Sequence, residues 1–337
     1  MKARCLFAAL GFIAFSAHAE FDRKIYQRIS PSVARVAALN EGGMVAMGSA
    51  VVVAPGKLIT NCHVTRDARA IDIIAWGSQW KVKQQVKDIG HDLCLLIVGS
   101  DLGKVAEFAD PGMLKIGGDV AAVGYPAGLR LQITEGHVKG LHELDGERVI
   151  QSSAPFASGE SGGGLFDRDG KLVGIITFRA QEIGDYYFAV PAAWIKKLLD
   201  SEIVEFVDAK QSEAFWEQRA SAQPNFLRAI SHETQKDWPN LKSLADEWIK
   251  LEAQNPEAYL ALGKSSYFLQ HPSDAVHALR KAVALDPRHS LAWLWLGLSY
   301  RESRDTKGAA QAMEQLSILD PMAAKMLLGD VSRDDPK

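Results

Sequence analysis

Three residues in the sequence have the chemistry that nucleophilic catalysis requires. Ser161 lies in the stretch SGESGGGLF, His63 in KLITNCHVT and Asp92 in HDLCLLIV. Hydrolysis of an amide through serine needs a nucleophile, a general base beside it and a group that orients the base. We therefore expect Ser161 to be the nucleophile, His63 the base and Asp92 the orienting group.

The local sequence around each residue suits its role, although none is decisive alone. His63 follows a strand-like run, and Asp92 opens a very apolar strand, where a buried acid needs a partner. The glycines around Ser161 allow a sharp turn in which the N–H groups of Gly159 and Ser161 face one oxyanion. A lone histidine is usually structural, a lone aspartate before a strand is commonly a cap, and GxSGG can be a plain glycine turn. Their combined occurrence, in the order His, Asp, Ser, favours the catalytic interpretation.

The N-terminus has the pattern of a secretory signal peptide. Lys2 and Arg4 precede an apolar run too short to span a bilayer, and Ala-His-Ala at 17–19 is a cleavage site of the A-x-A type. We expect removal of residues 1–19 and export to the periplasm; an N-terminal membrane anchor is the alternative. No later stretch predicts a membrane span, and a net charge of −3 gives no basic field for nucleic acid.

The rest of the chain changes character near Pro191. From 32 to 190, short runs rich in valine and isoleucine are broken by glycine, proline, asparagine and aspartate, which predicts an all-β domain. After Pro191 the spacing of apolar residues becomes helical. We expect a β domain over 20–207, a linker over 208–223 and a helical domain over 224–330.

The helical domain contains an internal repeat. Gly263 and Gly297 are separated by one 34-residue period, and small and bulky residues recur around them at matching offsets. This pattern resembles the tetratricopeptide repeat, in which each unit is a pair of helices. Clear units are expected at about 256–289 and 290–323. The stretch 224–254 is a candidate for a degenerate first unit, because such arrays need about three units to bury a core.

Five blocks of the β domain resemble the trypsin-like (chymotrypsin-fold) serine peptidases of the bacterial HtrA/Deg type. They include GSAVVVAPGKLITNCHV and IQSSAPFASGESGGGLFDRDGKLVGIIT, and together they occupy residues 48–64, 91–98, 120–138, 150–177 and 187–191. The resemblance implies two six-stranded β-barrels with the catalytic residues in the cleft between them. The expected fold is therefore an all-β double barrel followed by an all-α domain of tetratricopeptide type.

The same resemblance assigns roles to individual residues. It implies His63 as general base, Asp92 as its orienting group and Ser161 as nucleophile, with oxyanion donors from the backbone of Gly159, Glu160 and Ser161. No cofactor is implied. Glu160 stands where the family has asparagine or aspartate, and we expect its side chain to point to solvent. Helical repeats stand where HtrA members carry PDZ domains, which puts activation by peptides through such domains in doubt.

Two cysteines flank the expected catalytic pair. Cys62 directly precedes His63, and Cys94 lies two residues after Asp92. In the implied fold their strands converge in the first barrel, so we expect a disulfide between them in an oxidising compartment. Two buried free thiols are the alternative. Neither the cysteines nor the histidines have the spacing of metal ligands, so no metal site is expected.

The substrate pocket is harder to read. The implied fold places its lining in three stretches, from which we expect Pro155, Thr177, Phe178, Arg179 and Phe188 to contribute. No aspartate stands near Pro155, so a preference for Lys or Arg is not expected. A small or medium apolar residue is the better candidate, and Arg179 could shift the choice toward acidic residues. His137 and His142 are expected at the surface.

The expected function is that of an exported serine endopeptidase that cleaves protein or peptide bonds through an acyl-enzyme. The repeats would bind a substrate or a protein partner, or mediate self-association. The alternative is a latent or inactive protease-like scaffold whose repeats mediate protein–protein interaction, because a triad in the sequence does not guarantee an assembled oxyanion site.

Overall fold

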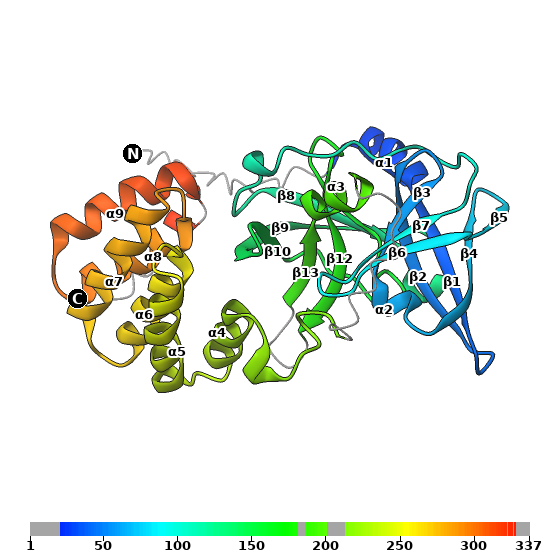
Figure 1. Ribbon diagram of the computed structural model, residues 1–337. Coiled ribbons are helices and arrows are strands. Elements are labelled where there is room, and N and C mark those ends of the chain that lie inside the picture. The colour runs from blue at the N-terminus through cyan, green and yellow to red at the C-terminus, as the bar shows by residue number, and fades with distance from the viewer. Residues whose placement is uncertain (1–20, 181–185, 201–212, 322, 326, 328–337) are drawn as a thin grey trace, which may run out of the picture.

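A computed structural model describes residues 21–180, 186–200, 213–321, 323–325 and 327. It contains a β-rich part followed by a helical part, as expected, and the two lie side by side in Figure 1. The predicted signal peptide, residues 1–19, lies outside the described residues.

The first half of the β-rich part is a seven-stranded antiparallel sheet. A helix, α1 (Arg23–Ile29), and a 3-10 turn precede it, and the one-turn helix α2 (Cys62–Thr65) interrupts it. Its strands are β1 (Val33–Asn40), β2 (Val45–Ala54), β3 (Lys57–Thr60), β4 (Ala68–Ala75), β5 (Ser78–Lys81), β6 (Gln84–Asp88) and β7 (Leu93–Ile97). Their order in the sheet is β5-β4-β1-β2-β3-β7-β6.

Seven strands replace the six that the resemblance implied, because one strand is split. The edge strands β5 and β6 are separated in sequence only by Val82 and Lys83. Val82 N–H donates to Ile71 O on one side of the sheet (2.9 Å), and Lys83 N–H donates to Ile97 O on the other (2.8 Å). The short connection through Val82 and Lys83 therefore links the two edge strands of the sheet.

The second half is a closed barrel of six antiparallel strands, as expected. The strands are β8 (Asp119–Gly124), β9 (Gln132–Leu144), β10 (Glu147–Ser152), β11 (Gly164–Asp167), β12 (Leu172–Ala180) and β13 (Tyr186–Pro191), in the order β10-β13-β12-β11-β8-β9. The helix α3 (Ala192–Asp200) follows Pro191, where the pattern in the sequence becomes helical. It buries Trp194 and Ile195 against the β-rich part.

Six helices form antiparallel pairs in the described C-terminal part. They are α4 (Asn225–Thr234), α5 (Trp238–Leu251), α6 (Pro256–Phe268), α7 (Pro272–Leu285), α8 (Ser290–Glu302) and α9 (Thr306–Leu319). Gly263 shows why small residues recur in the repeat: a Cβ there would lie 2.4 Å from Leu279 Cγ on the neighbouring helix. Asn255 caps α6 and Asp305 caps α9, each with a side-chain oxygen that accepts from a backbone N–H.

The helical part packs against the second barrel through a buried histidine. His142 on β9 is 7% exposed, so the expectation that it lies at the surface was wrong. Its Nδ1 lies 2.6 Å from Glu257 Oε1 on α6, its Nε2 lies 3.0 Å from Gln151 Oε1, and its ring stacks on Phe226 of α4. Burial alone would lower the pKa of His142, but these partners hold it above its ordinary value. The interface thus includes a buried ion pair between the two parts.

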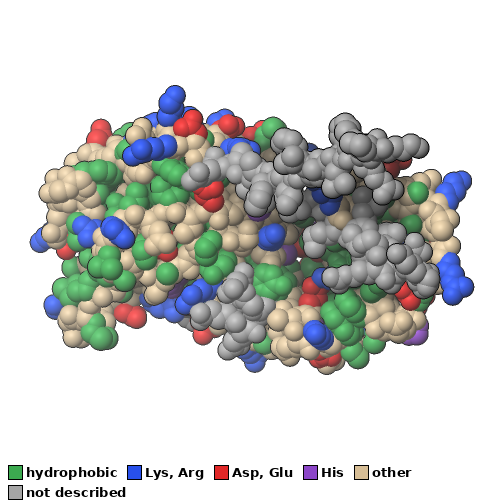
Figure 2. All heavy atoms as spheres, turned by 180° about the vertical axis from the view of Figure 1, so that it is seen from behind, with side chains coloured by type: hydrophobic (Ala, Val, Ile, Leu, Met, Phe, Trp, Pro, Cys, Tyr) green, Lys and Arg blue, Asp and Glu red, His purple; other side chains and the backbone are tan. Residues whose placement is uncertain are grey.

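The surface has mixed charge. On the face shown in Figure 2, Lys and Arg side chains are interspersed with Asp and Glu, and neither sign dominates the described part of that face. None of the described helices combines the length and apolar character needed to cross a bilayer.

Candidate active site

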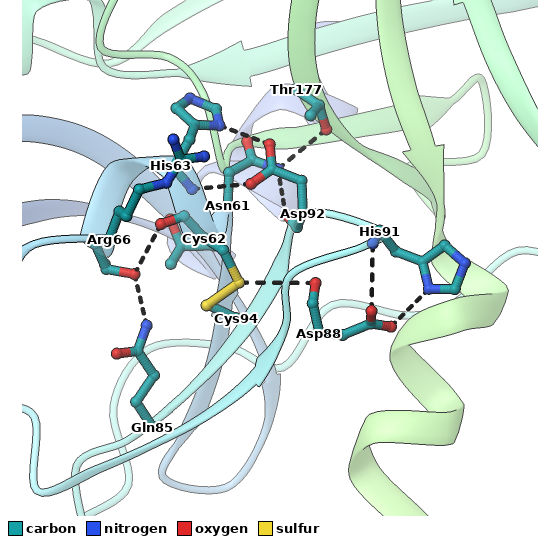
Figure 3. Close-up of a disulfide and its surroundings, with 12 residues drawn as sticks. Asn61, Cys62, His63, Arg66, Gln85, Asp88, His91, Asp92, Cys94 and Thr177 are labelled. Carbon is teal, nitrogen blue, oxygen red and sulfur yellow. Dashed lines mark hydrogen bonds and ion pairs between the residues drawn. A yellow bond between two sulfur atoms is a disulfide. The ribbon is translucent and has the colours of Figure 1, made fainter. Parts of the chain in front are cut away.

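His63 and Asp92 lie close together beside the paired strands β3 and β7 of the first sheet. The chain leaves β3 at Thr60 and turns into α2, which carries His63, while Asp92 immediately precedes β7. Because β3 and β7 are paired, the two residues come together (Figure 3). His63 Nδ1 lies 2.6 Å from Asp92 Oδ2, and His63 N–H donates to Asp92 Oδ1 at 2.9 Å.

The carboxylate of Asp92 is fully buried and held in place. The residue is 0% exposed and has a left-handed backbone with φ of 58°, a conformation that aspartate tolerates better than most residues. Its carbonyl oxygen accepts from Asn61 Nδ2 at 2.9 Å, and Asn61 also donates to Thr177 Oγ1 in the second barrel. Trp216 also donates to this residue, from its Nε1 to Asp92 Oδ2 at 3.1 Å. The buried charge is therefore surrounded by donors, as its burial requires.

Ser161 lies on a turn formed by glycines with positive φ. Gly159 has φ of 94° and Gly162 has φ of 87°. A Cβ on Gly162 would lie 2.1 Å from Ser49 O, so the turn passes too close to the first sheet for a larger residue. The Ser161 hydroxyl donates to Thr177 O at 3.2 Å. Within the described residues, no hydrogen bond joins Ser161 to His63.

Ser49 on β2 ties the Ser161 turn to the first sheet. Its N–H donates to Ser161 O at 2.9 Å, and its hydroxyl donates to Gly159 O at 3.0 Å. The same hydroxyl accepts from Tyr125 N–H at 2.8 Å. The turn that carries Ser161 is thus fixed relative to the sheet that carries His63.

The backbone of the turn leaves two donors available. The N–H groups of Gly159 and Ser161 have no acceptor among the described residues, whereas Glu160 N–H donates to Ala157 O at 3.0 Å. Gly159 and Ser161 therefore remain candidate oxyanion donors, while the N–H of Glu160 is already used within the turn.

The side chain of Glu160 does not point to solvent. The residue is 1% exposed, because Gly124 leaves room for its side chain: a Cβ on Gly124 would lie 2.8 Å from Glu160 Cβ. Glu160 Oε2 accepts from Ala157 N–H at 2.6 Å, and Oε1 has no partner among the described residues. Burial raises the pKa of this carboxyl, and the bond from Ala157 offsets only part of that effect. The expectation of a solvent-facing side chain was wrong.

The raised pKa of Glu160 predicts a pH-dependent stability. Since the folded protein holds this proton more tightly than the unfolded chain, the stabilising contribution is complete below the ordinary pKa of glutamate and is lost as pH rises through the raised value. Glu160→Gln keeps an acceptor for Ala157 N–H and does not titrate. We expect the free energy of unfolding of this variant, relative to wild type, to increase between about pH 4 and pH 8.

Urea unfolding of both proteins across that range measures the difference. Glu41→Gln at an exposed position serves as the control and should not reproduce the trend. A difference between wild type and Glu160→Gln that stays constant with pH would show that Glu160 does not titrate in this way.

Cys62 and Cys94 form a disulfide, which confirms the prediction (Figure 3). Both residues are buried, and the bond joins α2 to β7. It closes a loop of sequence separation 32 that begins beside His63 and ends beside Asp92. The disulfide therefore limits how far the two residues can separate.

Removal of this disulfide should destabilise the protein. On the chain-entropy account, Cys62→Ala with Cys94→Ala should lower the free energy of unfolding by about 3–4 kcal/mol. Guanidinium unfolding with and without a thiol reductant measures the effect. Reductant should destabilise the wild type and leave the double variant unchanged; equal stability of the oxidised wild type and the double variant would contradict the prediction.

The expected pocket residues differ in their exposure. Pro155 and Arg179 are exposed, Thr177 and Phe178 are buried beside the Ser161 turn, and Phe188 is 0% exposed. Phe178 and Phe188 stack at 4.7 Å between ring centroids. The pocket assignment remains a prediction. Within the described residues, no group of three or more His, Cys, Asp or Glu side chains is placed to hold a metal ion.

Trp216 is a residue near this site that sequence reasoning missed, as are Asn61 and Ser49. It falls in the predicted linker, 208–223, whose described portion begins at residue 213. Its indole lies 124 residues along the chain from its partner Asp92. The only local signal is the run of aromatic residues in EAFWEQ, which is apolar for a solvated linker.

Comparison with known proteins agrees with this architecture. Residues 48–175 match the trypsin-like peptidase domain, and residues 260–324 match the tetratricopeptide repeat. The periplasmic serine endoprotease DegP of Salmonella typhimurium is 33% identical over 180 residues, which cover 50% of this chain and 38% of DegP. DegP of Escherichia coli is 32% identical over 190 residues, 52% of this chain and 40% of DegP.

A solved structure supports the fold of the β-rich part. The active form of a protease from M. tuberculosis superposes with a TM-score of 0.50 at 23% identity, over 53% of this chain and 84% of that one.

The chain spans about two fifths of the length of the DegP relatives. The β-rich part of this chain is therefore similar to the trypsin-like peptidase domain of the periplasmic DegP endoproteases, and residues 260–324 of the helical part that follows match the tetratricopeptide repeat.

Proposed function

We propose that the protein is an exported serine endopeptidase in which His63, Asp92 and Ser161 form the catalytic triad. One observation carries the proposal: a buried aspartate lies 2.6 Å from Nδ1 of a histidine, in a trypsin-like domain whose glycine turn presents a serine. The periplasmic serine endoproteases that the domain resembles support the reaction class and the compartment.

The contacts of His63 favour the tautomer that a general base needs. With its Nδ1 proton directed at Asp92 Oδ2, the ring leaves Nε2 free to accept a proton from a serine hydroxyl. The Ser161 hydroxyl donates to Thr177 O in this state, so rotation about its χ1 torsion must precede attack. The turn itself is fixed by Ser49, and only the side chain has to move.

The reaction then follows acyl transfer. Ser161 Oγ attacks the substrate carbonyl as its proton passes to His63 Nε2, and the resulting oxyanion accepts from the N–H groups of Gly159 and Ser161. The protonated His63 is stabilised by Asp92 and gives its proton to the leaving amine, which releases the first product. Water, deprotonated by His63, then hydrolyses the acyl-enzyme and restores Ser161.

The repeats are proposed to bind a protein substrate or partner, or to mediate self-association. An aromatic cluster on their surface supports contact with polypeptide. Phe268 in this cluster is 38% exposed. Its ring centroid lies 3.9 Å from that of Trp238, on which it stacks, and 5.3 Å from that of Trp295. A latent scaffold with the same repeats is the second candidate, favoured by the Ser161 hydroxyl that donates to Thr177 rather than to His63.

A cleavage profile distinguishes the two. The protein without residues 1–19 is incubated with a peptide library and with an unfolded protein, alongside Ser161→Ala. The proposal predicts Ser161-dependent cleavage, with a small or medium apolar residue before the cleaved bond. No cleavage by either protein at any pH from about 5 to 9 would favour the scaffold, whereas cleavage that persists in Ser161→Ala would show that another group is the nucleophile.

A further inference from the structure

The segment 213–219 lies across the two residues of the buried pair. Phe215 N–H donates to Gly90 O at 3.0 Å, two residues before Asp92. Glu217 pairs with Arg66, three residues after His63. The segment is therefore attached to both chain stretches that carry the pair, and it continues through residue 223 into α4 of the helical part.

Between these attachments, the indole of Trp216 contacts both members of the pair. Its Nε1 donates to Asp92 Oδ2 at 3.1 Å. Its ring makes a T-shaped contact with the ring of His63, with 5.5 Å between centroids and an interplanar angle of 86°. It also stacks on Phe178, with 5.0 Å between centroids and an interplanar angle of 8°. Phe178 directly follows Thr177, the residue that accepts from Ser161. Trp216 thus contacts residues of both the first sheet and the barrel.

The hydrogen bonds of Asp92 show what the indole does. Oδ1 accepts from His63 N–H, and Oδ2 accepts from both His63 Nδ1 and Trp216 Nε1. A fully buried carboxylate gains most from each such charge-assisted bond, because no water replaces a lost donor. The second donor on Oδ2 also fixes the direction in which that oxygen faces the imidazole.

We propose that Trp216 is a positioning residue of the catalytic site, an inference that rests on the proposed peptidase function. It acts through Asp92 and His63: the N–H holds Oδ2 toward His63 Nδ1, and the ring restricts the rotation of the imidazole. The segment that joins the two parts of the protein is thereby a component of the site.

A single substitution separates the hydrogen bond from the packing. Trp216→Phe keeps an aromatic ring against His63 and Phe178 but removes the N–H. We expect kcat for a short peptide substrate to fall about 10- to 100-fold, with KM within about twofold, since a hydrogen bond to a charged group is lost without a substrate contact. Trp76→Phe, which removes an indole N–H at an exposed position directly after β4, is the matched control and should retain the kcat of the wild type.

Two kinetic outcomes would overturn the inference. An unchanged kcat in Trp216→Phe would show that the bond has no effect on the reaction. A loss confined to KM would show that Trp216 binds substrate and does not position Asp92. Urea unfolding of each variant confirms that the folded state is being compared.

A measurement independent of catalysis tests the contact itself. In protein labelled with ¹⁵N-tryptophan, the indole resonance of Trp216 is assigned by its disappearance in Trp216→Phe. It should shift in Asp92→Asn, while that of Trp76, assigned in the same way with Trp76→Phe, stays in place; an unmoved Trp216 resonance would refute the contact. A wild type without peptidase activity would remove the proposed function and the positioning role with it, whereas an active wild type matched by Trp216→Phe would remove the positioning role alone.

Discussion

Ser161→Ala should lower the kcat of peptide hydrolysis about 10⁶-fold. The substitution removes the oxygen that forms the acyl-enzyme, and no other hydroxyl replaces it, because Thr177 Oγ1 is committed to Ile175 O and to Asn61. The backbone of the turn should be preserved, since the bonds to Ser161 O and Gly159 O come from Ser49. KM should therefore change little, and initial rates with a fluorogenic peptide measure both constants.

Ser158→Ala provides the matched control, because Ser158 is exposed on the same turn. It should keep kcat within about twofold, as surface substitutions outside a site usually do. Retention of more than a hundredth of the activity in Ser161→Ala, in protein free of contaminating peptidase, would show that another group is the nucleophile.

Asp92→Asn should lower kcat about 10⁴-fold. The carboxylate accepts three N–H groups, two from His63 and one from Trp216. An asparagine has one acceptor oxygen and one donor amide at this place, so one orientation opposes the backbone N–H of His63 and the other opposes both Nδ1 and the indole. In the second orientation, the clash with Nδ1 is relieved only if the imidazole proton moves to Nε2, which removes the base, and the clash with the indole N–H remains.

Asp145→Asn controls for the removal of an acidic side chain close to the site. Asp145 is exposed and contacts His91 Nε2 at 3.1 Å, one residue before Asp92. This variant should retain near wild-type kcat. A loss below about tenfold in Asp92→Asn would contradict the role assigned to the buried carboxylate, and urea unfolding determines whether a larger loss reflects the site or the fold.

The parts of the site that the sequence predicts are those with a local signature. Cys62, which begins α2 after β3, and Cys94, on the adjacent strand β7, flank His63 and Asp92, so the family resemblance was enough to pair them correctly. The role of the glycines around Ser161 is likewise predictable from the local sequence, because their positive φ angles depend only on the geometry of the turn itself.

The parts that were missed depend on neighbours far along the chain. Glu160 is buried because Gly124, on a different strand, leaves the space for it. His142 is buried because α6 supplies Glu257 from 115 residues away, and Trp216 is 124 residues from Asp92. Neither burial nor a partner of this kind is encoded in the spacing of the residues themselves, so each becomes visible only in the folded structure.

The most direct test of the triad is to locate a covalent adduct on the nucleophile. The protein without residues 1–19 is treated with a fluorophosphonate between about pH 6 and 9 and analysed by peptide mass spectrometry, beside Ser161→Ala and His63→Ala. The triad predicts one adduct, on Ser161, that is absent in Ser161→Ala and forms far more slowly in His63→Ala. An unmodified Ser161 under conditions that label a control peptidase, or a rate that does not depend on His63, would contradict it.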